Sequence, residues 1–184
     1  MGNETPAAGG GPKRKPLVHF QLARAATPTK LLITFFLLLL LLSFFFGALY
    51  SYEKTGLGME GTRLRYQGAA EDEETEELHF PISDEELLRL THVHTFGLAI
   101  MFYLFGHVFI LTSVKAVTKN AMLISFFVFL LVFIAAPWLT RYRAGFGFLF
   151  IGSLGILCVQ ALFLSAVPIY EMWFDRRTSE STAD

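Results

Sequence analysis

The sequence predicts an all-α integral membrane protein, built as an up-down bundle of four helices with both termini in the cytoplasm. Hydrophobic residues make up 53% of the 184 residues, more than a soluble domain of this size needs for its core. They are grouped in long apolar blocks rather than spaced at periods of two or 3.6 residues, as in half-buried strands and helices. The net charge of −1 gives no general attraction to nucleic acid. The single Cys158 excludes a disulfide or a cysteine cluster within one chain.

The first apolar block, residues 31–50, contains no charged side chain. Its 20 residues would rise about 30 Å as a helix, enough to cross the hydrocarbon core of a bilayer. The block is too long for a typical signal-peptide core, so we expect an uncleaved signal anchor. Residues 1–30 form a basic N-terminal arm, which favours a cytoplasmic location for this end of the chain.

Residues 51–90 are expected to form an acidic loop on the outer, periplasmic side. This segment holds eleven acidic residues against four basic ones. Its acidic run, Glu71–Glu77, is typical of a solvated loop, or it is a docking patch for a basic partner such as a soluble electron carrier. At the end of the loop, Ser83 is a candidate helix cap with Glu86 three residues later, so the second helix is expected to begin near Asp84.

Three further apolar blocks complete the bundle. Residues 91–114 form the second predicted span, residues 121–139 the third and residues 144–170 the fourth. The fourth is rich in glycine, which permits close packing on a neighbouring helix. Residues 171–184 are expected to be a cytoplasmic tail, with Glu171 a solvated carboxylate at the inner boundary. Gln160 in the fourth span is expected to bond to another helix, and Arg141 to be an interface anchor.

The second span carries His92, His94 and His107, and a membrane helix needs a reason to hold imidazoles. At about 100° per residue, His92 and His94 point about 200° apart, whereas His92 and His107 differ by about 60° and lie about 22 Å apart along the axis. His92 therefore shares a face with Phe96, Tyr103 and His107, while His94 belongs to another face.

A b-type haem is one use for these histidines, because an imidazole nitrogen binds haem iron. The separation of His92 and His107 resembles that of the two histidines on one helix of membrane b cytochromes. The other three spans contain no histidine, so a haem would need a Met ligand, a second copy, another subunit or five-coordinate iron. A copper or zinc site at the outer surface, using His92 or His94 with His79 and acidic side chains, is the second candidate. Proton or quinone chemistry at His107 and Tyr103 is the third.

The alternative is that the imidazoles only form hydrogen bonds to neighbouring helices. We therefore expect an accessory subunit of a respiratory or photosynthetic electron-transfer complex, with no catalytic activity of its own. The competing hypothesis is a structural or assembly subunit without a cofactor. The expected partners are the lipid bilayer and either other membrane subunits or a second copy.

Four segments together resemble a family of uncharacterised bacterial four-helix inner-membrane proteins. They are Thr91–Gly97 (THVHTFG), the small residues around Gly106, Trp138–Tyr142 (WLTRY) and Tyr170–Trp173 (YEMW). The resemblance covers roughly residues 31–174 and implies a four-span topology in a bacterial inner membrane. It implies no catalytic role. The matched motif positions are His92, His94, Trp138, Arg141 and Glu171.

Overall fold

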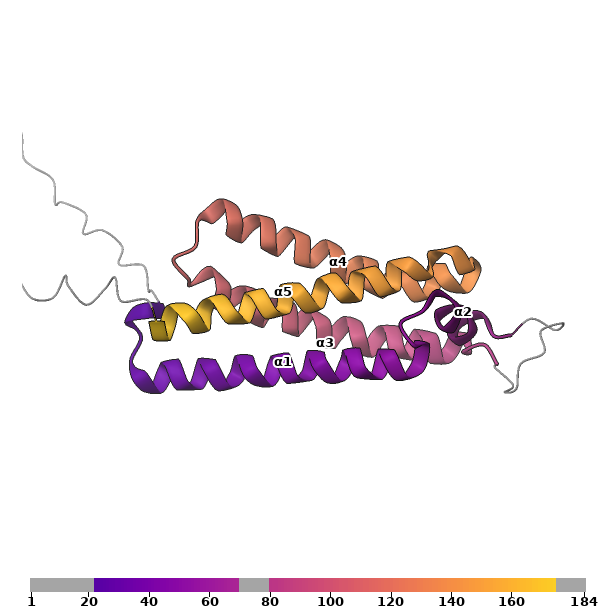
Figure 1. Ribbon diagram of the computed structural model, residues 1–184, viewed down its shortest axis with the longest axis horizontal. Helices are drawn as coiled ribbons and strands as arrows, with labels where there is room; N and C mark the ends of the chain where they lie inside the picture. Colours follow the sequence, from indigo (N-terminus) through magenta and orange to yellow (C-terminus); the bar gives the residue numbers. More distant parts are fainter. Residues whose placement is uncertain (1–21, 70–79, 175–184) are drawn as a thin grey trace, which may run out of the picture.

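The computed structural model describes residues 22–69 and 80–174, and within them every regular element is a helix (Figure 1). Four helices are long and apolar enough to cross a membrane, which confirms the predicted helical membrane bundle. The spans are α1 (Thr27–Thr55), α3 (Asp84–Ile110), α4 (Ala116–Tyr142) and α5 (Gly147–Phe174). Between the first two lies the short α2 (Met59–Gln67), and single 3-10 turns, η1 (Leu22–Arg24) and η2 (Ala144–Phe146), precede α1 and α5.

The fourth span forms the centre of the bundle, because α5 contacts each of the other three spans and is the most buried of the four. Its buried face includes Leu157, Ala161 and Leu164, which pack against Phe105 and Phe126 in the main apolar core. By contrast, α1 is the least buried span, and most of its large apolar side chains face outward. Such a surface is stable only in lipid, which is consistent with membrane insertion.

The second span ends earlier than predicted. The second span was predicted to reach Val114, but α3 ends at Ile110, where the Thr112 hydroxyl donates to the carbonyl of Phe109 at 2.7 Å and the chain turns. The start of α3 is as predicted, because the Ser83 hydroxyl accepts a hydrogen bond from the backbone N–H of Glu86 at 3.2 Å. The acidic run Glu71–Glu77 lies outside the described residues, as do His19 and His79.

The predicted loop 51–90 contains α2, which the sequence reasoning missed. Gly56 adopts φ 58° and ends α1, and α2 then folds back against the end of that helix. The contact is tight at Gly61, where an added Cβ would lie only 2.1 Å from the backbone oxygen of Thr55. Tyr66 and Thr62 bury the opposite side of α2, so this short helix forms a fixed cap over one end of the bundle.

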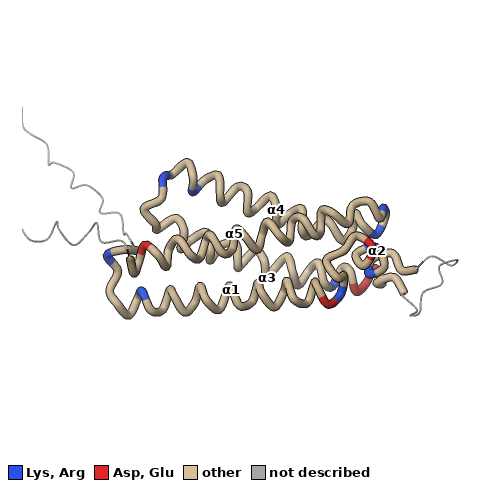
Figure 2. Tube along the Cα trace, viewed as in Figure 1, with Lys and Arg blue, Asp and Glu red and all other residues tan. Residues whose placement is uncertain are grey.

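The two ends of the bundle carry different charges (Figure 2). We call the end that carries α2 the α2 end, and the other the terminal end, because the chain enters α1 and leaves α5 there (Figure 1). Among the described residues, the terminal end holds four basic side chains and one acidic one, whereas the α2 end mixes both signs. This bias agrees with the expected cytoplasmic location of the terminal end.

Glu171 at the terminal end is not the solvated carboxylate that its position near the tail suggested. It is only 5% exposed, and its Oε2 accepts hydrogen bonds from the backbone N–H and the hydroxyl of Ser113, at 2.7 and 3.0 Å. Glu171 thereby joins α5 to the turn after α3. Gln160 does form the interhelical bond expected of it, donating to the hydroxyl of Ser125 on α4 at 2.6 Å.

Candidate functional site

The three histidines of α3 are divided between two faces, as helical phase predicted. His92 and His107 lie on the exposed face together with Phe96 and Tyr103. The rings of Tyr103 and His107 stack, with centroids 5.7 Å apart and an interplanar angle of 25°. His107 is in the last turn of α3. Neither imidazole on this face forms a hydrogen bond to another described residue.

The predicted metal ligands His92 and His94 do not meet in one site, and neither of them meets His107. Among residues 22–69 and 80–174, no group of three or more His, Cys, Asp or Glu side chains is placed to hold a metal ion.

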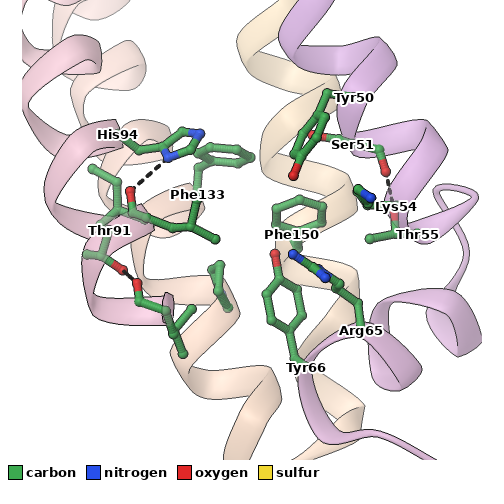
Figure 3. A pocket seen from close by; sticks show the side chains of 14 residues that line it. Tyr50, Ser51, Lys54, Thr55, Arg65, Tyr66, Thr91, His94, Phe133 and Phe150 are labelled. Carbon is green, nitrogen blue, oxygen red and sulfur yellow. Dashed lines mark hydrogen bonds between the residues drawn. The ribbon is translucent and has the colours of Figure 1, made fainter. Parts of the chain in front are cut away.

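His94 differs from the other two because its side chain lines a cavity (Figure 3). Its Nδ1 lies 2.8 Å from the carbonyl oxygen of Leu90. A carbonyl can only accept a hydrogen bond, so Nδ1 carries the proton. In the neutral ring, Nε2 is then an acceptor with no hydrogen-bond partner among the described residues.

The cavity beside His94 consists of two adjoining parts, which share Tyr50, Ser51, His94 and Phe133. We call the two parts together the crevice. It lies between α1 and α3, the neighbouring spans that contact each other least, and α4 and α5 form its back wall. Its two parts have volumes of about 90 and 240 Å³.

We call the part of the crevice at the α2 end the polar part, because it carries the charged side chains, although most of its lining is apolar. Lys54 from α1 and Arg65 from α2 line it, together with the phenol rings of Tyr50 and Tyr66 (Figure 3). The Lys54 ammonium lies 5.7 Å from the centroid of the Tyr50 ring. Arg65 lies 3.6 Å from a carboxylate oxygen of Glu86, a long ion pair. Among the described residues no Asp or Glu lines the crevice, so this part is positively charged.

Burial of Tyr66 controls its protonation. The pKa of its phenol is raised from 10.0 to about 12, mainly by burial; the positive charge of Arg65 partly opposes the change and the nearby Tyr50 adds a smaller increase. Tyr66 is therefore neutral at physiological pH and keeps the hydroxyl proton that a ligand could accept.

The part of the crevice nearer the middle of the spans is apolar. It is lined by Phe44, Leu98, Met101, Leu154 and Leu157. Two glycines, Gly47 of α1 and Gly97 of α3, also line it, and a Cβ built on either would meet nothing within 4 Å. Glycines in membrane helices usually allow two backbones to touch. Here they leave space between α1 and α3.

Motif residues next to the crevice hold its walls together. The Trp138 indole N–H donates to the Thr91 hydroxyl at 2.9 Å, which joins α4 to α3. Arg141 pairs with Asp84 at 2.7 Å and donates to the carbonyls of Ile82 and Tyr66, at 2.6 and 3.2 Å. Arg141, expected to be an interface anchor, therefore fixes α2 and the start of α3 to the end of α4.

Sequence reasoning found one residue of the crevice, His94, and missed its cationic and glycine residues. Ten residues lie between Lys54 and Arg65, and the chain reverses its direction there, so no sequence motif connects them. The only signal in the sequence was the pair Gly47 and Gly97, which interrupt spans that otherwise consist mainly of bulky residues.

The comparisons with known proteins identify the family but no activity. A family model described as a transmembrane helical domain matches residues 56–179, more than half of the chain. The match covers α2 to α5 and begins after α1. No curated protein and no solved structure matches the chain. The protein therefore belongs to this family of transmembrane helical domains.

Proposed function

We propose that the protein is an accessory membrane subunit that holds a lipid-soluble, amphipathic molecule in the crevice. The observation that carries this proposal is the distribution of charge along the crevice: Lys54 and Arg65 line the part at the α2 end, and no described Lys, Arg, Asp or Glu lines the part nearer the middle of the spans. A mostly apolar cavity with a few convergent polar groups is typical of small-molecule sites.

The position of the crevice favours entry from the bilayer. It lies between α1 and α3, and α1 is both the least buried span and the one outside the matched family region. A molecule dissolved in lipid would reach the apolar part by passing between these two helices, without crossing a polar surface. This route favours a membrane-soluble ligand over a water-soluble one.

Filling the apolar part tests the proposal. Gly47→Leu would place a side chain in the crevice, where there is room at least for its Cβ, which meets nothing within 4 Å. The matched control is Gly155→Leu on the exposed side of α5, where a Cβ also meets nothing. The measurement is mass spectrometry of the amphiphiles extracted from each purified protein. We expect about one bound molecule per chain in the wild type and in Gly155→Leu, and its loss in Gly47→Leu. Equal amounts in all three proteins would contradict the proposal.

Electron transfer through a b-type haem is a second candidate function, favoured by the exposed face of α3. His92 and His107 face outward from the bundle, where uncovered imidazoles are costly in hydrocarbon. A second copy or another subunit of an electron-transfer complex would cover them and supply the missing iron ligand. The absorption spectrum of the protein, purified with any associated subunits, tests this function. A Soret band that shifts on reduction and is lost in His107→Leu or His92→Leu is expected, with His94→Leu as control.

The remaining alternative is a structural or assembly subunit without a cofactor. A colourless preparation free of metal, in which Gly47→Leu neither changes the extracted amphiphiles nor disturbs assembly, would support this alternative over both candidate functions.

A further inference from the structure

We infer that the ligand of the crevice is a phospholipid with an anionic headgroup, whose phosphate lies between Lys54 and Arg65 and one of whose acyl chains lies along Gly47 and Gly97. This inference rests on the proposed function and specifies the class of molecule that it concerns. Three properties of the crevice support it: its charge, its hydrogen-bond donors and its length.

The charge of the polar part favours an anion. Lys54 and Arg65 both line it, and no carboxylate does so among the described residues. Lys54 forms no ion pair in that part of the chain, and the pair of Arg65 with Glu86 is long, at 3.6 Å. Two neighbouring cations repel each other, and an opposite charge between them reduces that repulsion. A phosphate would supply that charge, and a guanidinium binds phosphate oxygens in a two-pronged geometry.

The hydroxyl groups of the polar part add neutral donors. The side chains of Tyr50, Lys54, Arg65 and Tyr66 come from two helices, and their polar ends lie around the same space (Figure 3). Because burial raises the pKa of Tyr66 to about 12, its hydroxyl keeps its proton and can donate to a phosphate oxygen. The polar part therefore offers two cations and two phenols to one group.

The length of the crevice agrees with one leaflet of a bilayer. On α1 the lining residues run from Ser43 to Thr55, and Lys54 is eleven residues from Ser43. At 1.5 Å per residue this is about 16 Å, close to half of the roughly 30 Å hydrocarbon core. A phosphate at Lys54 would place an acyl chain beside Gly47 and Gly97 and end it near the middle of the bilayer.

These dimensions favour a phospholipid over the other amphiphiles of a membrane. A quinone has an uncharged head, which would leave Lys54 without a counter-charge and Arg65 with only its long ion pair to Glu86. A free phosphate would satisfy the cations but would leave the apolar part, about 240 Å³, without an occupant. An anionic phospholipid occupies both parts.

Native mass spectrometry of the full-length protein, delipidated in mild detergent, tests the inference. The probes are dioleoyl phosphatidylglycerol, which is anionic, and dioleoyl phosphatidylcholine, which has the same chains and no net charge. The wild type is expected to bind one phosphatidylglycerol at least about tenfold more tightly than phosphatidylcholine. Lys54→Gln combined with Arg65→Gln should abolish that preference.

The matched control removes two cations from the same end of the bundle outside the crevice. Arg89 and Arg143 are exposed and do not line it, so Arg89→Gln combined with Arg143→Gln should keep the tenfold preference. If the crevice double variant does not fold, Lys54→Gln alone replaces it, because the Lys54 side chain is exposed. The preference for phosphatidylglycerol should then fall by at least about threefold.

The remaining outcomes separate the inference from the proposed function. If both lipids bind equally and both are lost in Gly47→Leu, the headgroup inference is wrong and the amphiphile site remains. If Gly47→Leu keeps the preference for phosphatidylglycerol, the lipid binds elsewhere and the inference is overturned. Displacement of the lipid by millimolar inorganic phosphate would show that phosphate alone is the ligand and would overturn the inference. Copurification of a quinone that occupies the crevice in place of the phospholipid would overturn it as well.

Discussion

Arg141 and Glu171 show how single polar side chains organise an otherwise apolar bundle. Arg141 donates to the carbonyl of Ile82, which precedes α3, and to the carbonyl of Tyr66 in the last turn of α2. Glu171 accepts from the backbone N–H and the hydroxyl of Ser113 in the turn after α3. An unpaired backbone group in lipid costs roughly several kcal/mol. Arg141 and Glu171 therefore stabilise the turns at the ends of the spans. The motif positions Arg141 and Glu171 therefore have an architectural role in the bundle.

Tyr66 gives a prediction at the residue scale. Its pKa is about 12 in the folded protein and 10.0 when exposed, because burial disfavours the phenolate. The folded state therefore loses stability as pH rises from about 10 to about 12, since the unfolded chain releases the proton first. The loss across this window is roughly 2 to 3 kcal/mol at most.

Tyr66→Phe removes the titrating group and should reduce the alkaline loss of stability. The measurement is the thermal unfolding midpoint in detergent from pH 8 to pH 12 for both proteins. Identical declines in the wild type and in Tyr66→Phe would show that another group controls alkaline unfolding.

At the scale of elements, α2 determines the polar part of the crevice. It carries Arg65 and Tyr66, and its position depends on the close approach of Gly61 to the end of α1. The aromatic ring of Tyr66 also packs edge-on against Phe150 of α5, with centroids 5.9 Å apart. Loosening α2 would therefore remove a cation and a phenol from the crevice together.

Gly61→Ala is expected to displace α2 and to destabilise the protein by roughly 1 to 3 kcal/mol, because the new Cβ would lie 2.1 Å from a backbone oxygen that cannot easily move. Thermal unfolding and the rate of tryptic cleavage at Arg63 and Arg65 measure the effect. Gly58→Ala is the matched control, since its Cβ would be 4.0 Å from the same Thr55 oxygen. Equal cleavage rates in the two variants would contradict the tight fit of α2.

At the scale of the whole molecule, the four spans place the turn between α3 and α4 and the turn before α5 at opposite ends of the bundle. The basic bias of the terminal end predicts that Lys115 lies in the cytoplasm and Arg143 outside. The crevice would then open toward the outer leaflet.

Cysteine labelling in intact cells checks this orientation. In a Cys158→Ser background, Arg143→Cys should react with an impermeant maleimide in intact cells, and Lys115→Cys only after permeabilisation. Both positions are exposed in the structure, so accessibility within the protein is matched. The reverse pattern would invert the topology and place the crevice in the inner leaflet.

The sequence predicted those features that depend on neighbouring residues along one helix. Long uncharged blocks had to become spans, because lipid satisfies no backbone hydrogen bond outside a helix. Ser83 and Glu86 marked the start of α3, and helical phase separated His94 from the face of His92 and His107. Each of these inferences needs only the geometry of a single helix.

The tertiary structure alone decided which residues meet across helices. The sequence of α2 is mostly polar, so its folding against Thr55 and its delivery of Arg65 to Lys54 could not be predicted from its own periodicity. Likewise, a glycine in a span is compatible with close packing or with open space, and only the positions of α1 and α3 show that Gly47 and Gly97 face a crevice. Local sequence determines whether a segment is a helix in lipid, but the contacts between helices depend on the packing of all the spans together.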